Sequence, residues 1–390
     1  MNPLALGGMP LEVFLAEYWQ KKPLLIRGGL KNLQSPLDAD SLAGLACEED
    51  VESRLVIQSG SHWRLEHGPF NDKTFSALPS SHWTLLVQAV DHWVPAAAQL
   101  LEQFNFIPSW RIDDLMMSYA TDGGGVGPHY DNYDVFLVQA CGQRTWEIGG
   151  RCDESSGTRE KLPVKILTEF KAVQSWVLDP GDILYVPPGI AHNGMAKGDG
   201  CITCSVGFRA PSHAEMLSEF SDYLAEKLNE SERYSDADLS AQSNTGEITP
   251  AALARAQKIF ARYLANDKAL GDWFGRYVTA TKYGHIKAEV DSPPESMADV
   301  VGLAEHLAAG GTVVRSEGSR FAYIGEGERH ALFVDGERVA TSVGVSDLVE
   351  LLCSNIKFDN KLVEATEANL KLLAQLLSDG SLYMDGGNGV

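Results

Sequence analysis

The chain has 390 residues, a length that suggests two or three domains. Its 53 acidic and 32 basic residues give a formal net charge of −21, which argues against a phosphate-binding surface and suits a basic partner. No run of 18 apolar residues occurs and the N-terminus lacks a basic-then-apolar signal, so we expect a cytoplasmic protein without a membrane segment.

The N-terminal hundred residues predict a mixture of helices and strands. Residues 9–19 have apolar side chains at helical spacing, and residues 23–26 have the composition of a buried strand. An Asp cap indicates a helix over 40–46, and Ser59-Gly60 indicates the turn of a hairpin between 51–57 and 61–66. A long apolar-striped helix is predicted over 83–104.

The stretch 115–148 carries the residues on which the functional prediction depends. His129 and Asp131 are two residues apart, so in extended backbone both side chains point to the same face. His192 follows a Pro-Pro-Gly turn and completes a set of two imidazoles and one carboxylate. This ligand set is typical of non-haem Fe(II) oxygenases, which keep coordination positions open for substrate chemistry.

A buried arginine accompanies the ligand set. Residues 134–140 predict a strand, 141–143 a turn and 144–148 a returning strand, so Arg144 is expected on a strand antiparallel to the first, among apolar neighbours. A guanidinium in such surroundings needs an anion and binds a carboxylate through two parallel hydrogen bonds. A carboxylate cosubstrate beside iron indicates 2-oxoglutarate, with O2 at the remaining position. Short strands and tight turns from 113 to 208 are typical of a jelly roll or cupin.

Three segments resemble the JmjC-type ribosomal oxygenases. They are FLAEYWQKKPLLIR (14–27), GGGVGPHYDNYDVF (123–136) and PGDILYVPPGIAH (180–192). The match is to the bacterial branch, which hydroxylates an arginine of large-subunit ribosomal protein L-sixteen; eukaryotic relatives tend to use Lys where this chain has Arg144.

The resemblance implies a mainly β jelly-roll fold (double-stranded β-helix, cupin/JmjC) over 1–210, with an N-terminal helix-and-strand flank. It implies that His129, Asp131 and His192 bind Fe(II) as the catalytic centre, that Arg144 and Ser118 bind 2-oxoglutarate, and that a basic ribosomal protein is the substrate. The net charge agrees with such a partner.

An arginine pocket follows from strand alternation. Asp114, Met116 and Ser118 alternate along one strand, so Asp114 and Met116 are expected to face the same cavity as Ser118. A carboxylate and a thioether suit a guanidinium and its aliphatic stem. Tyr133 is expected to cover the stem from the other side, and Ser205 to accept a remaining N–H.

The composition changes at Pro211. Amphipathic helices over 212–228 and 249–264, joined by a polar loop, have too few apolar faces to close a core alone, so we expect residues 211–284 to form a homodimerisation region. Residues 285–390 predict a winged-helix-like α+β domain with helices over 297–308, 346–354 and 364–377 and strands over 312–315, 320–324, 330–334 and 382–384. Its 8 basic and 17 acidic residues favour protein contacts over nucleic-acid binding.

Other function classes stay open at the level of the sequence. A metal-binding cupin that regulates transcription through its winged-helix-like domain is one alternative, although the acidic charge of that domain counts against it. A cupin isomerase without 2-oxoglutarate is another, but it leaves Arg144 without an anion. Lysine demethylation is conceivable within the oxygenase class.

Overall fold

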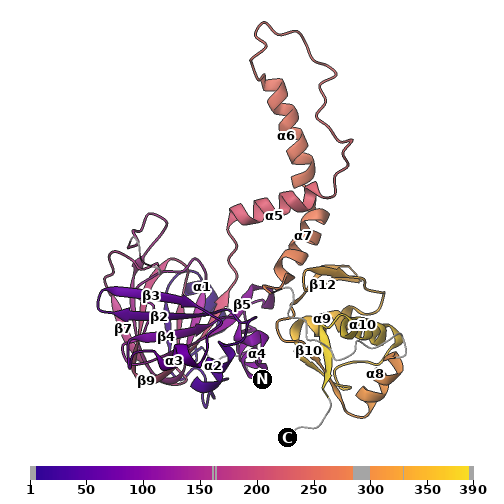
Figure 1. Cartoon of the computed structure of the whole chain (residues 1–390). Helices are drawn as coiled ribbons and strands as arrows, with labels where there is room; N and C mark the ends of the chain where they lie inside the picture. Colours follow the sequence, from indigo (N-terminus) through magenta and orange to yellow (C-terminus); the bar gives the residue numbers. More distant parts are fainter. Residues whose placement is uncertain (1–5, 160–161, 163–164, 284–298, 328, 386–390) are drawn as a thin grey trace. The chain divides into compact units, whose positions relative to one another are not determined.

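The structure is a computed structural model that describes residues 6–159, 162, 165–283, 299–327 and 329–385. The chain divides into two compact units, residues 1–210 and 211–390, and Figure 1 traces both. The expected boundary between 284 and 285 and the expected helix start at 297 lie outside the described residues. Among the described helices, none has the length and apolar character needed to cross a bilayer.

A nine-stranded antiparallel sheet forms the framework of the first unit, in the order β1-β8-β6-β9-β5-β4-β2-β3, with β7 also paired to β6. Figure 1 shows β3, β2 and β4 side by side. The strands are β1 (Leu24–Ile26), β2 (Ser53–Ser59), β3 (His62–His67), β4 (Trp83–Val87), β5 (Ile112–Ala120), β6 (Val135–Arg151), β7 (Gln174–Leu178), β8 (Ile183–Val186) and β9 (Ile190–Phe208). The mainly β architecture predicted from the sequence is confirmed.

Alternation along the strands divides the side chains between two faces. On β4 and β5, Leu85, Val87, Leu115 and Met117 belong to the main apolar core together with Phe14 of the N-terminal helix. Residues between them, such as Leu86 and Ser118, point to the other face of the sheet, which we call the inner face. The helices of this unit are α1 (Leu11–Glu17), α2 (Ala39–Leu45), α3 (Asp72–Ser76) and α4 (Pro95–Leu101), with 3-10 turns η1 (Val90–His92), η2 (Glu102–Phe104) and η3 (Ser109–Arg111). The inner face is therefore the place where polar side chains meet.

The helix predicted over 83–104 is wrong. Residues Trp83–Val87 form β4, which pairs with β2 and β5. The chain then turns at Ala89, which has a positive φ of 49°, and helix α4 begins only at Pro95, whose fixed φ suits the first helical position. Aromatic and β-branched residues at the start of the segment favour a strand once neighbouring strands are available.

The turn predicted at 141–143 is also wrong. Strand β6 continues without a break through these residues to Arg151, and its pairing with β9 shifts register at Gln139/Cys141 and at Cys141/Gln143. Gly142 has a positive φ of 63°, which resembles a turn in the sequence but here belongs to a bulge. Arg144 therefore lies on the same strand as Val135, not on a returning one.

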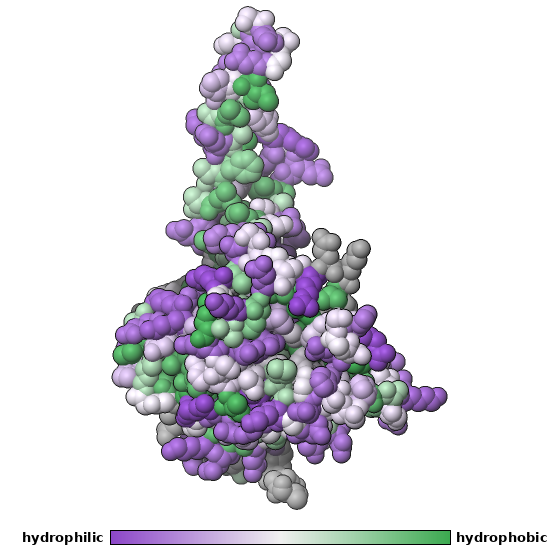
Figure 2. All heavy atoms as spheres, turned by 90° about the vertical axis from the view of Figure 1, so that its left-hand side faces the viewer, coloured by the Kyte–Doolittle hydropathy of each residue, from purple (hydrophilic) through white to green (hydrophobic). Residues whose placement is uncertain are grey.

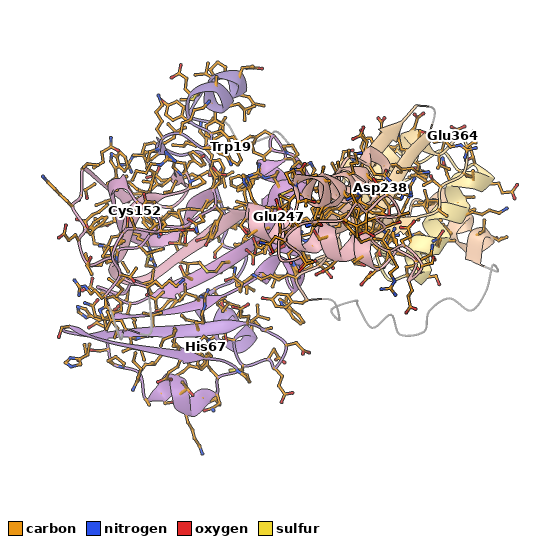
Figure 3. All side chains as sticks on the ribbon, turned by 90° about the horizontal axis from the view of Figure 1, so that it is seen from above. Trp19, His67, Cys152, Asp238, Glu247 and Glu364 are labelled. Atoms are coloured by element: carbon orange, nitrogen blue, oxygen red, sulfur yellow. The ribbon has the colours of Figure 1, made fainter. Side chains whose placement is uncertain are left out.

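The second unit begins with three helices, α5 (His213–Ala225), α6 (Pro250–Leu264) and α7 (Asp267–Thr279). Ser212 caps α5 in a capping box with Glu215, as its sequence predicted. Phe220 of α5 is buried against Trp273 of α7, with ring centroids 5.1 Å apart. The polar loop before α6 runs back along that helix (Figure 1), and Asp238, labelled in Figure 3, belongs to this loop. Its carboxylate pairs with Arg255 of α6 at 2.7 Å.

The remainder of the second unit is the α+β domain. One sheet has the order β14-β10-β15 and the other β11-β12-β13, and helix α7 packs against the latter. The elements are α8 (Asp299–Ala308), β10 (Thr312–Arg315), β11 (Phe321–Glu326), β12 (Arg329–Val334), β13 (Glu337–Val339), α9 (Ser346–Ser354), β14 (Lys357–Phe358), α10 (Glu367–Ser378) and β15 (Leu382–Asp385). Apart from the undescribed start of the first helix, the predicted helices and strands of this domain are confirmed within a few residues at their ends.

Candidate metal and cosubstrate site

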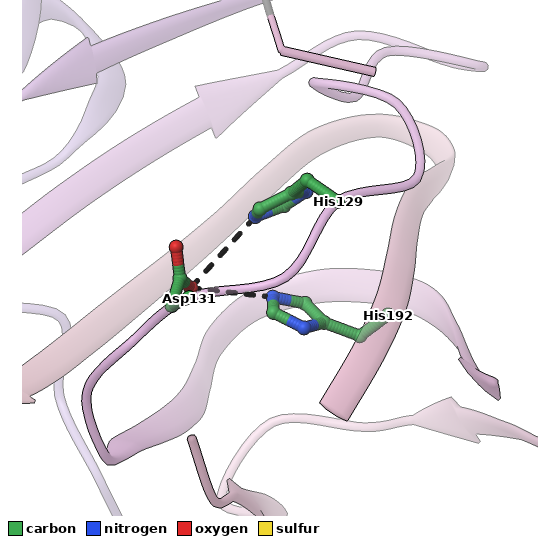
Figure 4. A group of neighbouring side chains, drawn as sticks. All are labelled: His129, Asp131 and His192. Atoms are coloured by element: carbon green, nitrogen blue, oxygen red, sulfur yellow. Dashed lines mark ion pairs between the residues drawn. The ribbon is translucent and has the colours of Figure 1, made fainter. Parts of the chain in front are cut away.

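Two histidines and an aspartate converge at one end of the inner face (Figure 4). One ligand atom from each of His129, Asp131 and His192 lies within 4.8 Å of the others. Asp131 Oδ2 is 3.6 Å from His192 Nε2 and 3.9 Å from His129 Nε2. Separations of this size fit three donors around one ion at ligand bonds of roughly 2 Å.

Backbone hydrogen bonds hold the three residues in register. His129 and His192 exchange two backbone hydrogen bonds, with N–O distances of 3.0 and 2.8 Å, and the N–H of Gly189 donates to the carbonyl of Asp131. The two backbone segments lie so close together that a side chain at Gly125 would not fit. A Cβ there would lie 2.4 Å from the carbonyl oxygen of Gly194. The glycines around the motif therefore allow the two ligand segments to meet.

The backbone also sets the protonation of both imidazoles. Nδ1 of His129 is 2.9 Å from the carbonyl oxygen of Gly127, and Nδ1 of His192 is 2.9 Å from that of Ile190. A carbonyl only accepts, so each Nδ1 carries the proton and each Nε2 presents a lone pair toward Asp131. Burial, together with the neighbouring His129, lowers the pKa of His192 to about 4. The His192 ring is thus held in the neutral form that a metal requires.

Arg144 is buried, and no acidic side chain among the described residues forms an ion pair with it. Its guanidinium belongs to a residue only 4% exposed, and neither Nε nor Nη2 has a hydrogen-bond partner among the described residues. These two nitrogens form the edge of the guanidinium that grips a carboxylate side-on. The ring of Trp146 lies 5.7 Å from Arg144 Cζ and 5.9 Å from the His192 ring, so it contacts both the cation and the metal ligand.

Ser118 and Thr84, a residue that the sequence did not single out, lie on the same face of the neighbouring strands β5 and β4. Ser118 is buried on β5, opposite Leu86 of β4. Two residues along β4, Thr84 is fully buried, and its hydroxyl has no partner within the described parts of the chain. Buried polar atoms without partners cost free energy unless a ligand satisfies them. A bound anion would satisfy the unpartnered donors of Arg144, and the Thr84 hydroxyl is a further buried polar group that a ligand on this face could satisfy.

The four residues of the predicted arginine pocket lie close together. Met116 and Ser205 are directly paired across β5 and β9, and Asp114 occupies an irregularity of β5, where its pairing with β9 shifts register. A Cβ at Gly207 would lie 3.7 Å from Asp114 Oδ1 and 4.0 Å from Cε2 of Tyr133. Asp114 is 3% exposed, whereas Tyr133 is 42% exposed.

Tyr133 also connects this group to the metal ligands. Although the residue as a whole is 42% exposed, burial around its phenol group, the charges of Asp131 and Asp114, and a hydrogen bond to Asp131 raise the pKa of Tyr133. The phenol therefore stays protonated at neutral pH and is close enough to both carboxylates to be affected by their charges. The predicted pocket and the His-Asp-His cluster are neighbours.

Comparison with known proteins gives consistent matches over the whole chain. Residues 99–216 match the JmjC domain family, and residues 262–383 match the ROXA-like winged helix. The ribosomal protein uL16 3-hydroxylase of Escherichia coli is 34% identical over 96% of this chain and 97% of its own length. A protein of Haemophilus influenzae named "probable ribosomal oxygenase" is 38% identical over 69% and 68% of the two chains. The solved structure of the ribosomal oxygenase YcfD from Escherichia coli, in complex with cobalt and 2-oxoglutarate, matches with a TM-score of 0.84 at 32% identity, covering 99% of this chain and 100% of that chain.

Proposed function

The chain belongs to the JmjC-domain ribosomal oxygenases, which are 2-oxoglutarate-dependent dioxygenases, and on that premise we propose that it hydroxylates an arginine side chain of ribosomal protein uL16 with Fe(II) and O2. The observation that carries the proposal is the presence of a His-Asp-His cluster together with a buried arginine that has no anionic partner within the described part of the chain. A cytoplasmic location follows from the choice of a ribosomal protein as substrate.

His129, Asp131 and His192 are the proposed iron ligands. Two imidazole nitrogens and one carboxylate oxygen are the donor set that leaves positions open for 2-oxoglutarate and O2. When bound, iron and 2-oxoglutarate supply the oxidising power that places one oxygen atom of O2 on an unactivated C–H bond. The backbone carbonyls of Gly127 and Ile190 orient the imidazoles for this role.

Arg144 is the proposed anchor of 2-oxoglutarate, and Ser118 a second donor. The side-on edge of the guanidinium matches a carboxylate in charge and in the number of donors. An isomerase reaction without an anionic cosubstrate leaves this buried charge unexplained, so the arginine favours the oxygenase over that alternative. The ring of Trp146 lies 5.7 Å from Arg144 Cζ and 5.9 Å from the His192 ring, so the proposed anchor and the metal ligand share one neighbour.

The substrate arginine is proposed to bind beside Tyr133. Asp114 receives the guanidinium, Met116 packs along the methylene stem, Tyr133 covers it from the solvent side, and Ser205 accepts an N–H. The neighbourhood of Asp114, Tyr133 and Asp131 supports this placement, because a stem held there reaches toward the metal ligands. A cationic side chain also offsets the negative charge that Asp114 brings into a buried position.

Mass spectrometry of uL16 from cells with and without this protein tests the function. Hydroxylation adds one oxygen, so an arginine-containing peptide is expected to gain about 16 Da only when the protein is present. The same shift on a lysine or histidine would contradict the proposed residue type. Its absence from every uL16 peptide would contradict the proposed substrate.

We further propose that helix α6 mediates homodimerisation and that the C-terminal domain contacts protein. Leu253, Phe260 and Leu264 are spaced seven and four residues apart, so they form one row on α6, and each is more than 40% exposed. Figure 2 shows apolar side chains gathered in this helical part of the molecule. An exposed apolar row of this kind favours burial against a second copy.

Phe260→Glu is expected to convert the dimer into a monomer at micromolar concentration, because it places a charge in the apolar row. Light scattering measures this as a halved molar mass. Ala251→Glu adds the same charge on the exposed start of α6, off the row, and should remain dimeric. Phe220 is unsuitable for the test because it is buried against Trp273, so the apolar side of the helix predicted over 212–228 is partly covered within the chain itself. A monomeric wild type would refute the proposal.

A further inference from the structure

A side-chain amide lies between two charged groups at the edge of the proposed substrate pocket. Gln88 directly follows β4, and its backbone N–H donates to the carbonyl of Glu52 at 2.9 Å. Its Nε2 donates to Asp114 Oδ2 at 2.7 Å, and its Oε1 accepts from Arg54 Nη2 at 3.1 Å. Three residues from β2, the end of β4 and β5 thus form one continuous chain of hydrogen bonds.

The direction of this amide follows from its partners. A guanidinium only donates and a carboxylate only accepts, so the oxygen of Gln88 must face Arg54 and its nitrogen must face Asp114. Both hydrogen bonds involve an ionised group and are therefore of the stronger kind. The hydrogen bond from Arg54 to Oε1 restricts rotation of the Gln88 amide group. It therefore also fixes the position of Nε2 relative to Asp114.

The amide reaches the oxygen of Asp114 that does not face the pocket. Oδ2 receives Gln88, whereas Oδ1 lies on the side of Gly207 and Tyr133. A carboxylate that binds a guanidinium through two hydrogen bonds must lie in the plane of that guanidinium. By holding Oδ2, Gln88 fixes the orientation of the Asp114 carboxylate plane. A direct contact with Arg54 would instead neutralise the carboxylate and bring a cation close to a cationic substrate.

We propose that Gln88 is a positioning residue that orients Asp114 toward the substrate guanidinium, with Arg54 holding the amide in place. The inference rests on the proposed function, in which Asp114 receives the arginine. It adds that selectivity for arginine depends on a residue that does not touch the substrate. An amide in this position holds one oxygen of the carboxylate without adding a positive charge beside it.

Steady-state kinetics with an arginine-containing uL16 peptide tests the role. Gln88→Leu removes both hydrogen bonds, and Gln88→Glu keeps the shape but repels Asp114. Each is expected to raise the KM for the peptide by about 10- to 100-fold, the cost of losing a hydrogen bond to a charged group. The KM for 2-oxoglutarate and its decarboxylation without peptide should stay within about twofold of the wild-type values, because Arg144 and the metal ligands are untouched.

Matched controls separate positioning from general damage. Gln58 lies on β2 of the same sheet and donates to the carbonyl of Gly60, so Gln58→Leu and Gln58→Glu make the same changes outside the pocket and should behave as wild type. If Gln88→Leu does not fold, Gln88→Glu carries the comparison. A KM for 2-oxoglutarate that rises together with that of the peptide overturns the positioning role.

A double-mutant cycle with Asp114→Asn gives the decisive readout. If Gln88 acts through Asp114, then Gln88→Leu adds little to the loss already caused by Asp114→Asn, whereas independent effects would multiply. Additive losses overturn the inference. Wild-type peptide kinetics in both Gln88 variants, alongside lost turnover in Asp114→Asn, also overturn it but leave the proposed pocket standing. Normal turnover by Asp114→Asn itself removes the pocket, and the inference with it.

Discussion

His192→Ala is expected to abolish peptide hydroxylation and 2-oxoglutarate decarboxylation while the protein remains folded. Loss of a residue that merely orients a metal ligand typically costs about 10- to 100-fold in metal affinity or activity, so loss of a ligand should exceed about 100-fold. The fold tolerates the change because His192 is held in place by backbone hydrogen bonds to His129, and alanine makes the same bonds. Stopped turnover with a cooperative thermal transition is therefore the predicted result.

The metal itself provides a second measurement of this variant. Co2+ binding, followed by its visible absorption, should weaken by more than about 100-fold in His192→Ala. His67→Ala removes an exposed imidazole from β3 and should bind the ion as the wild type does. Full decarboxylation by His192→Ala with iron supplied would exclude His192 from the centre.

The order of most elements along the chain could be predicted from local signals, but strand β4 and the residue that follows it could not. Residues 83–104 have apolar side chains at spacings compatible with a helix, and only the pairing of β4 with β2 and β5 makes Trp83–Val87 a strand. The error concealed Thr84 and Gln88, because the alternation that puts them on the same face as Ser118 exists only in extended backbone. A strand prediction for this segment would have pointed to both.

The site was more predictable than its framework. The resemblance to the JmjC-type ribosomal oxygenases is confirmed, and His129, Asp131 and His192 come together because short motifs and tight turns specify their local backbone. Arg144 is buried beside Trp146 as predicted, but on a continuous strand. The two register shifts around Cys141 determine the face on which Arg144 lies, and they depend on pairing with β9, which composition does not specify.

Arg144→Lys is expected to weaken 2-oxoglutarate binding by about 10- to 100-fold, and Arg144→Ala by more. Lysine keeps the charge but cannot offer two parallel donors, so one hydrogen bond to a charged group is lost, worth about 1.5–3 kcal/mol. Calorimetry measures the affinity directly. Arg151→Lys makes the same replacement at the exposed end of β6 and should leave the affinity unchanged.

Thermal unfolding distinguishes a cosubstrate anchor from a structural ion pair at Arg144. In the protein without ligand, a buried guanidinium with two unpaired nitrogens is a cost, so Arg144→Met should unfold at the same or a higher temperature than the wild type. Added 2-oxoglutarate stabilises a protein that binds it, by about 2.7 kcal/mol at 100 times the Kd, and this stabilisation should vanish in Arg144→Met. If Arg144 instead supports the fold, the variant will unfold at a lower temperature and still respond to 2-oxoglutarate. Only the structural role thus predicts a lower unfolding temperature for Arg144→Met, and only the anchor role predicts that 2-oxoglutarate no longer stabilises it.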